Sequence, residues 1–377
     1  MTGPVIVPLR EPPDLTAIAA ALPANYPFLL ESAAGGPLDR YSLLLRATGE
    51  TLELRADGCL TGPGKGDGFL DRLDDWYRSE AIPGEQFADT PFAGGWFVYL
   101  GYELAGEIEP SLELPPAGDG LPVALAARCD GAILLRHGAA ESAALVAEKP
   151  EVMDRMAAEL FGIDRDTTAT LTVLDELSAE PAAVFREHVK TIKEYLLAGD
   201  VFQVNLSRGW RGHFTPGVDP VRMYRALRAA NPSPFGGFML HGDQALLSSS
   251  PERLVEVTGR AVQTRPIAGT HPRGSNPEQD EALSRQMLDH PKEQAEHIML
   301  IDLERNDLGR VCEPGSVEVD ELMVLESYAH VHHIVSNVRG ILRPDISPVD
   351  VIRAVFPGGT ITGCPKVRCM EIIAELE

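Results

Sequence analysis

Short turn dipeptides constrain the fold of this chain more than any other feature of its sequence. Gly242–Asp243 and Thr258–Gly259 each separate two apolar or alternating runs within GGFMLHGDQALLSSSPERLVEVTGRAVQTRPIAGT. Two-residue turns of this composition join neighbouring strands of a hairpin, so the strands they connect run antiparallel. The first 150 residues carry further short runs bounded by glycine, proline and aspartate, such as YSLLLRAT and GAILLRHG. We expect an α+β fold in which antiparallel sheets pack as a sandwich with helices outside.

Residues 180–200 have the clearest helical pattern. Pro181 suits the first turn of a helix, and Gly199 is a natural C-cap. The apolar residues between them recur at helical spacing and form one stripe: Phe185, Val189, Ile192 and Leu196.

The C-terminal segment GCPKVRCMEIIAELE also begins as a helix, with Pro365 in its first turn, and stops at Glu377. It has no glycine or asparagine cap, and its last turn is acidic where the helix dipole favours cations. We therefore expect the fold to be C-terminally incomplete.

The net charge limits the partners that this chain can have. Its 33 Lys and Arg residues against 56 Asp and Glu residues give a formal charge of −23. Such a charge argues against nucleic acid or an anionic membrane surface as the main partner. It also repels a small anionic substrate, so arginines, helix N-termini or a metal ion would have to reverse the local field.

The sequence also indicates a compartment. The five cysteines are scattered, odd in number and without a C-x-x-C pair, which is typical of reduced thiols rather than a disulfide frame or a zinc cluster. The N-terminal stretch MTGPVIVPLREPPDL does not have the pattern of a signal peptide, and no run approaches 18 apolar residues. We expect a cytoplasmic protein that does not enter a membrane.

The segment HPKEQAEHIMLIDLERNDLGRV carries Glu293 and Glu296 directly before an apolar run. Three residues apart on a helix, the two carboxylates share one face at the edge of the protein core. Either that face is solvated, or a cation meets it there.

Three further motifs each have a functional and a structural interpretation. FPGGTITGCPK, residues 356–366, concentrates glycines before a helix and suits either an anion-binding turn or a tight turn that needs glycine. In SYAHVHHIVSNVRG, His333 is expected to point inward, as a core residue or as a catalyst. Glu252 in SSSPERL and the Gly-Thr turn of TRPIAGTHPRG are weak signals by themselves, because a carboxylate at a turn is usually a solvated charge.

Taken in order, these motifs closely resemble those of the chorismate-utilising enzymes. The series runs GDVFQVNLS, NPSPF, SSSPERL, TRPIAGTHPRG, EHIMLIDLERNDLGRV, VHHIVS and FPGGTITGCPKVRCMEII, from about Gly199 to the last residue. YPFLLESA and GGWFVYLGYELAGE look like the N-terminal portion of the amino-transferring members. The resemblance implies an N-terminal anthranilate synthase component I-like region at 1–165 and a chorismate-binding catalytic region, truncated at its C-terminus, at 180–377.

The resemblance also implies roles for single residues. Glutamates of this family hold a Mg²⁺ ion that grips the ring carboxylate of chorismate, so Glu296 would be a metal ligand and Glu293 its neighbour. Glu252 would be the general acid toward the departing ring hydroxyl, and His333 would lie near the substrate. The substrate-binding positions would include Gly269, Thr270, Gly359, Thr360 and Gly363, and a tryptophan pocket in some relatives maps onto Leu30, Glu31 and Ser32.

Two positions divide the family into subfamilies. The resemblance places Gln203 where the water-using isochorismate and salicylate synthases have a lysine that activates water. Glutamine cannot deprotonate water at neutral pH. Ala268 stands where many aminodeoxychorismate synthases have a nucleophilic lysine, and alanine there is similar to anthranilate synthase. FPGGTITG and NPSPFGGF, however, look more like aminodeoxychorismate synthase.

We therefore expect aminodeoxychorismate synthase component I, which aminates chorismate at C4 with ammonia from a glutamine amidotransferase partner and without a covalent lysine intermediate. Anthranilate synthase component I is the alternative. A truncated, non-catalytic relative that only binds the amidotransferase is an alternative of another class.

Overall fold

The computed structural model describes residues 3–36, 38–81, 90–138, 142–161, 174–214 and 217–377, and its contacts divide the chain into two compact units. The first unit comprises residues 1–101, 117–173 and 214–251, and the second comprises 102–116, 174–213 and 252–377. Within the described ranges, no helix is long and apolar enough to cross a membrane.

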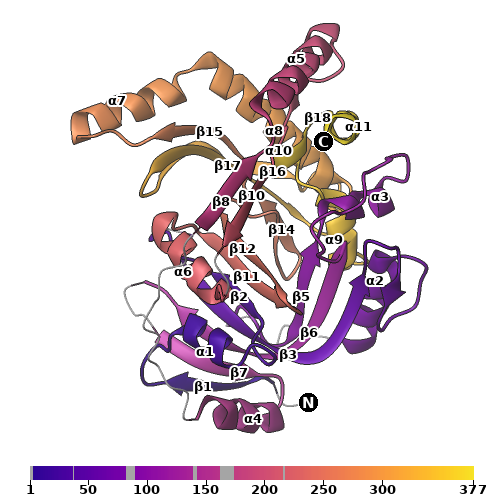
Figure 1. The fold of residues 1–377 in the computed structure, drawn as a ribbon, viewed down its shortest axis with the longest axis vertical. Coiled ribbons are helices and arrows are strands. Elements are labelled where there is room, and N and C mark those ends of the chain that lie inside the picture. Colours follow the sequence, from indigo (N-terminus) through magenta and orange to yellow (C-terminus); the bar gives the residue numbers. More distant parts are fainter. Residues whose placement is uncertain (1–2, 37, 82–89, 139–141, 162–173, 215–216) are drawn as a thin grey trace. The chain divides into compact units, whose positions relative to one another are not determined.

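The first unit is built on a nine-stranded antiparallel sheet with the order β1-β7-β6-β3-β2-β11-β12, in which β4 pairs with β3 and β5 with β6 (Figure 1). Its elements are β1 Val5–Leu9, α1 Leu15–Ala21, β2 Phe28–Glu31, β3 Tyr41–Leu54, β4 Leu60–Thr61, α2 Phe69–Glu80, β5 Gly95–Leu100, β6 Ala124–Arg136, β7 Ser142–Ala147, α4 Pro150–Leu160, α6 Pro220–Ala230, β11 Phe235–His241 and β12 Gln244–Ser250.

The second unit has a five-stranded antiparallel sheet in which β17 is central and pairs with β14, β15 and β16. Two short two-stranded sheets, β8–β10 and β9–β18, complete its strands. Its elements are η1 Tyr102–Leu104, α3 Ala105–Ile108, β8 Leu174–Ala179, α5 Ala182–Ala198, β9 Gln203–Val204, β10 Trp210–Phe214, β13 Glu256–Thr258, β14 Ala261–Thr264, β15 Ile267–Pro272, α7 Pro277–Leu288, α8 Pro291–Gly309, β16 Glu318–Ser327, β17 Val331–Ile341, α9 Pro348–Val355, α10 Gly359–Thr362, β18 Gly363–Cys364 and α11 Lys366–Leu376.

The α+β class and the antiparallel pairing are confirmed, and the hairpin turns explain them. Strands β11 and β12 are joined by the predicted two-residue turn Gly242–Asp243, in which Gly242 has φ 61°. The second turn lies one residue later than predicted, at 259–260, because Thr258 pairs with Ala261. A β-branched threonine fits the strand, whereas Gly259 adopts the positive φ of 61° that the turn needs. The packing of sheets as a sandwich stays a prediction.

The two units interleave along the chain, unlike the expected regions 1–165 and 180–377. Strand β11 pairs with β2 through Gly236–Met239 and Phe28–Glu31, so residues 235–250 extend the sheet of the first unit. Residues 102–116 are grouped with the second unit. Backbone pairing across 200 residues of sequence produces this exchange, and local sequence patterns carry no signal for it.

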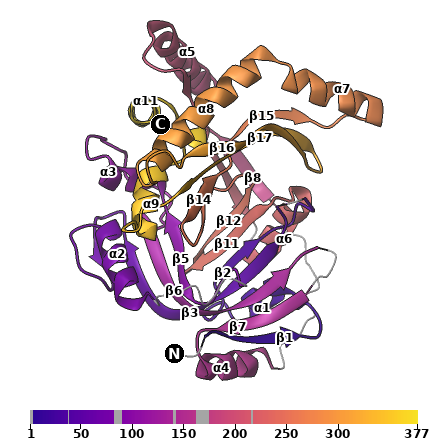
Figure 2. The same cartoon turned by 180° about the vertical axis from the view of Figure 1, so that it is seen from behind.

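Helix α8 covers the sheet of the second unit (Figure 2). Its buried residues recur at helical spacing: His297, Leu300, Ile301, Glu304 and Leu308. Apolar members of this stripe pack with Val262 of β14, Val338 of β17 and Val355 of α9 in one core cluster. Helix α5 ends as predicted at Gly199, which adopts the left-handed conformation with φ 81°.

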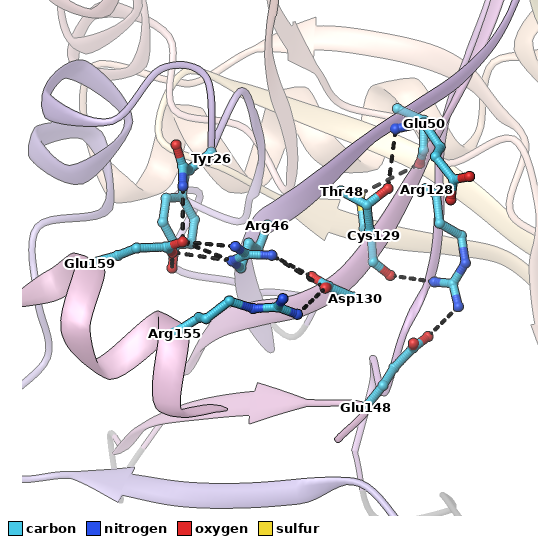
Figure 3. Close-up of polar contacts among 12 residues, drawn as sticks. Tyr26, Arg46, Thr48, Glu50, Arg128, Cys129, Asp130, Glu148, Arg155 and Glu159 are labelled. Atoms are coloured by element: carbon cyan, nitrogen blue, oxygen red, sulfur yellow. Dashed lines mark hydrogen bonds and ion pairs between the residues drawn. The ribbon is translucent and has the colours of Figure 1, made fainter. Parts of the chain in front are cut away.

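A buried ion network fastens α4 to the sheet of the first unit (Figure 3). Arg46 of β3 lies 3.0 Å from Asp130 of β6 and 2.7 Å from Glu159 of α4, and its side chain is about one-tenth exposed. The hydroxyl of Tyr26 donates a further hydrogen bond of 2.9 Å to Glu159. Burial alone would raise the pKa of Glu159, but hydrogen bonds from Arg46 and Tyr26 outweigh it and lower that pKa.

Replacing Arg46 by methionine should destabilise the first unit by about 3–5 kcal/mol, because it leaves the partly buried Glu159 without its cation and Asp130 with only the exposed Arg155 at 3.6 Å. Urea unfolding followed by the fluorescence of Trp76 and Trp96, which both lie in this unit, measures the loss. Arg55→Met is the matched control, since the Arg55–Asp57 pair is more than half exposed and solvent screening leaves it little effect on stability. Equal losses in the two variants would contradict this assignment.

Candidate active site

A bulge in strand β15 organises the candidate site. Ile267 pairs with Val335 and Thr270 with His333, so β15 advances three residues while β17 advances two. The extra residue lies within Ala268–Gly269, two of the predicted site positions. Bulges of this kind bend a strand and redirect its side chains, and they recur beside active sites.

His333 lies on β17 directly beside the bulge. Its Nδ1 is 2.8 Å from the hydroxyl oxygen of Thr270, and the ring also bonds the backbone of Gly269. Burial lowers the pKa of His333, and the nearby Glu326 carboxylate only partly opposes this shift. The histidine is therefore held mainly neutral, with its orientation fixed by two predicted substrate-binding residues.

His332 is buried as well, which the expectation of one inward histidine did not include. Its Nδ1 lies 2.7 Å from the Ser327 hydroxyl oxygen, and its Nε2 lies 2.9 Å from Asp280 of α7. Asp280 is also bound by two nitrogens of Arg273 and by the amide of Gly274. The Asp280 carboxylate therefore links α7 to the sheet. His332, which bonds to it, belongs to the same structural network.

Glu252 approaches the other end of the bulge. Its Oε1 accepts a hydrogen bond of 3.4 Å from the amide of Ile267, and its carboxylate accepts another from the hydroxyl of Thr360. Burial, opposed by these two bonds, raises the pKa of Glu252 from 4.5 to about 7. A carboxyl group with this pKa is partly protonated at neutral pH and suits a general acid.

The glycine-rich turn forms the short helix α10 and strand β18. A Cβ on Gly359 would lie 2.2 Å from Cδ2 of Leu303, and one on Gly363 would lie 2.1 Å from the carbonyl oxygen of Gln203. Glycine is therefore needed at both positions for close packing against α8 and β9, and Gly363 also has φ 131°. This supports the tight-turn interpretation, while the binding of a substrate anion here stays a prediction.

Glu293 and Glu296 lie three residues apart on α8, and each has its own described neighbours. A Cβ on Gly269 would lie 3.3 Å from Oε2 of Glu293, so this carboxylate reaches the bulge. Glu296 lines a cavity of about 960 Å³ together with Gln203, and its Oε2 is 4.0 Å from Nζ of Lys292. Both side chains are partly buried, which answers the alternative of a fully solvated face.

These carboxylates fit a Mg²⁺ ion that keeps most of its water. The described part of the chain has no group of three or more His, Cys, Asp or Glu residues that could form a protein cage. Mg²⁺ differs from Zn²⁺ in that one or two carboxylates, several waters and substrate oxygens commonly complete its octahedron. Glu296 and Glu293 therefore suit magnesium shared with a ligand.

The buried acid Glu304 was not foreseen from the sequence. Glu304 of α8 is 6% exposed and belongs to the buried stripe of that helix, next to Asp307 and Lys366. Burial above all, and then Asp307, raise the pKa of Glu304 to about 7. The signal was present in the sequence, since position 304 follows Leu300 and precedes Leu308 at the spacing of the core stripe.

The three residues of the expected tryptophan pocket lie in the first unit, whereas all the other predicted site residues lie in the second. Both oxygens of Glu31 are engaged, one by Arg228 at 2.7 Å and the other by the hydroxyl of Tyr224 at 3.1 Å. Ser32 donates a hydrogen bond of 2.7 Å to the carbonyl of Pro234, and Leu30 is 43% exposed. Tryptophan binding here stays a prediction.

Comparisons with known proteins identify the family that this chain resembles. A family model described as chorismate binding enzyme matches residues 41–377. A Synechocystis protein named anthranilate synthase component I-like protein is 43% identical over 288 residues, which cover 76% of this chain and 59% of the relative. Aminodeoxychorismate synthase component 1 of Bacillus subtilis is 54% identical over 193 residues, which cover 51% of this chain and 41% of the relative.

Structural similarity agrees with these matches. The crystal structure of anthranilate synthase component I from Streptococcus pneumoniae superposes with a TM-score of 0.76 at 30% identity, covering 90% of this chain and 77% of that chain. The chain spans less than two thirds of the length of the two curated relatives above.

The raised pKa of Glu252 predicts a pH-dependent contribution to stability. A carboxyl whose folded pKa lies above its unfolded value stabilises the fold fully below about pH 4.5, and this contribution is lost as pH rises through 7. Between pH 5 and 8, Glu252 should account for a loss on the order of 2–3 kcal/mol. Chemical denaturation at both pH values should therefore show a smaller loss in Glu252→Gln than in the parent protein.

Glu281→Gln on α7 is the control for this experiment, because it removes the same charge from an exposed side chain of the same unit. It should leave the pH dependence close to that of the parent. If Glu252→Gln behaved like this control, the Glu252 carboxyl would be ordinary and the assignment of a general acid would lose its physical basis.

Proposed function

Because the chain belongs to the chorismate-binding enzyme family, we propose that it is component I of an aminodeoxychorismate synthase. The reaction is the amination of chorismate at C4 by ammonia, which yields 4-amino-4-deoxychorismate for the synthesis of para-aminobenzoate and folate. The 54% identity to the B. subtilis protein of that name supports this assignment. The ammonia would come from a glutamine amidotransferase subunit, and the complex would act in the cytoplasm.

The observation that carries an ammonia-dependent reaction is the environment of Gln203. This residue lines the cavity that also contains Glu296, at the position where water-activating relatives would need a base. Its Oε1 is buried and has no hydrogen-bond partner among the described residues. An amide oxygen cannot take a proton from water at neutral pH, whereas it readily accepts a hydrogen bond from an N–H donor such as ammonia.

Ala268 supports a direct attack on the ring. It lies in the bulge of β15 between the contacts of Glu252 and His333. A methyl side chain supplies no nucleophile, so no covalent bond to the protein forms at this position. The bond from nitrogen to C4 and the loss of the C4 oxygen then belong to one substitution.

Glu252 would supply the proton for that substitution. As the ammonia lone pair forms the C4–N bond, the C4–O bond breaks, and the protonated carboxyl of Glu252 gives its proton to the departing oxygen, which leaves as water. Ammonia loses one proton in return, which restores the acid or passes to solvent. Partial protonation near pH 7 makes Glu252 able to start this cycle without external acid.

The remaining residues would bind and orient the substrate. The Thr270 hydroxyl and His333 ring present polar groups at the bulge, and the Gly359–Gly363 turn packs beside Glu252. Glu296 and Glu293 would hold Mg²⁺, which when bound neutralises a carboxylate of the substrate. This charge compensation is needed because chorismate is a dianion and the chain is strongly acidic.

Anthranilate synthase component I is the second candidate, favoured by Ala268 and by relatives that carry that name. Product analysis with chorismate, Mg²⁺ and ammonium separates the two reactions. We expect no direct formation of fluorescent anthranilate, and we expect p-aminobenzoate only after a lyase is added. Anthranilate formed without the lyase would refute the assignment.

Binding of chorismate without turnover would instead favour the non-catalytic alternative, a relative that only docks the amidotransferase. This outcome is distinguishable because calorimetry measures binding and chromatography measures product in the same samples.

Replacing Glu296 by glutamine should weaken Mg²⁺-dependent binding of chorismate by at least about tenfold, because one of the two carboxylates available to the ion is lost. Isothermal titration with and without Mg²⁺ measures this effect independently of turnover. Glu281→Gln again serves as the control of equal charge change. Undiminished Mg²⁺-dependent binding in Glu296→Gln would remove this residue from the metal site.

A further inference from the structure

The second unit buries an acid that the proposed reaction does not use. Glu304 is only 6% exposed, yet it occupies a core-facing position of α8 between Leu300 and Leu308. Burying a carboxylate costs several kcal/mol unless it is paired or becomes protonated. Lys366 of α11, a cation that acts on Glu304, is bound at 2.5 Å to Asp307 and therefore serves mainly that carboxylate.

Glu304 and Glu252 converge on one turn. A Cβ added to Gly359 would lie 3.7 Å from Oε1 of Glu304, so the carboxyl lies directly beneath this glycine. Glu252 accepts a hydrogen bond from the side chain of Thr360, the next residue. The two acids come from separate elements and meet at adjacent residues of α10, where the Glu252 charge acts on Glu304.

From this arrangement, we propose that Glu304 is a positioning residue that keeps the Glu252 carboxyl protonated at neutral pH by sharing a single negative charge with it. The reason is electrostatic. Two carboxylates close together in a buried site do not both ionise readily, so the presence of one favours the proton on the other. The proposal rests on the proposed function only in taking Glu252 as the general acid.

The charged groups around the pair support this interpretation. Glu304 faces Asp307 on its own helix, Lys366 of α11 and Glu252 from the segment before β13. Arg310 acts on Asp307. On the other side, Glu252 meets the neutral groups of Thr360 and Ile267. Burial is the largest cause that raises the pKa of both glutamates to about 7, and for Glu304 the carboxylates of Asp307 and then Glu252 add to it.

The test is a ¹³C NMR titration of the protein labelled at the side-chain carboxyl carbon of glutamate. The signals of Glu252 and Glu304 are assigned by their loss in Glu252→Gln and Glu304→Gln. In Glu304→Gln, the midpoint of Glu252 should fall by about one pH unit, because the like charge is removed while shape and burial are kept. Glu281→Gln should leave that midpoint unchanged.

The reciprocal variant keeps the test decisive if Glu304→Gln does not fold. Coupling between two sites is mutual, so in Glu252→Gln the midpoint of Glu304 should fall by the same amount. Midpoints that stay within about 0.2 pH units of the parent in the folded variants would overturn the proposal, since a coupling that small is below the effect expected of a buried pair.

A pH profile of turnover distinguishes this proposal from the proposed function. If Glu304 positions the proton of the acid, the alkaline limb of the profile should move to lower pH in Glu304→Gln by the shift seen in the NMR titration. A shift in the NMR titration with no product from any variant would leave the coupling established and refute the enzymatic assignment. Turnover with an unmoved alkaline limb would refute the positioning role alone.

Discussion

The bulge in β15 is the constraint on which the candidate site depends. Without the extra residue at Ala268–Gly269, the strand would keep a regular register against β17, and a shift of one residue turns every following side chain to the other face. The bulge allows the amide of Ile267 to meet Glu252 while the hydroxyl of Thr270 meets His333. Gly269 completes the arrangement, because a side chain there would crowd Ile334 and Glu293. One irregular strand thus joins a candidate acid, a neutral histidine and a candidate metal ligand.

The two units handle buried charge in opposite ways. In the first unit, Arg46 pairs with Asp130 and Glu159, so the network links three elements and lowers the pKa of Glu159. In the second unit, the partly buried Glu252 and the buried Glu304 act on each other, and the nearby Lys366 is bound to Asp307. A fold selected only for stability gains little from the second arrangement, since acids whose pKa values are raised in the fold destabilise it above neutral pH. Raised pKa values of this kind are typical of functional sites, and they support the role proposed for Glu252.

The sequence was sufficient for those features that depend on local chemistry. Gly242 marks a hairpin and Gly199 ends a helix, because both positions need a positive φ. The family motifs also indicated candidate residues of the second unit, because the order of the motifs along the chain is visible in the sequence. Sequence patterns could not predict the pairing of β11 with β2 or the bulge at Ala268–Gly269, because both depend on backbone register between distant segments. For Glu304 the sequence carries one signal only, its place at core spacing between Leu300 and Leu308 of α8.

Raised pKa values also bear on how an acidic protein could accept a dianionic substrate. Each ionised carboxylate of the candidate site adds to the electrostatic repulsion of an anionic substrate. The chain already carries a formal charge of −23. Protonation of Glu252 or Glu304 near neutral pH removes part of that repulsion at the place where the ring would bind. The proton that would suit Glu252 for acid catalysis would thus also reduce the repulsion of an anionic substrate. Both consequences follow from the pKa that burial raises. Glu293 and Glu296 remain as partly buried carboxylates, and a divalent cation is the species that would turn their charge from repulsive to attractive.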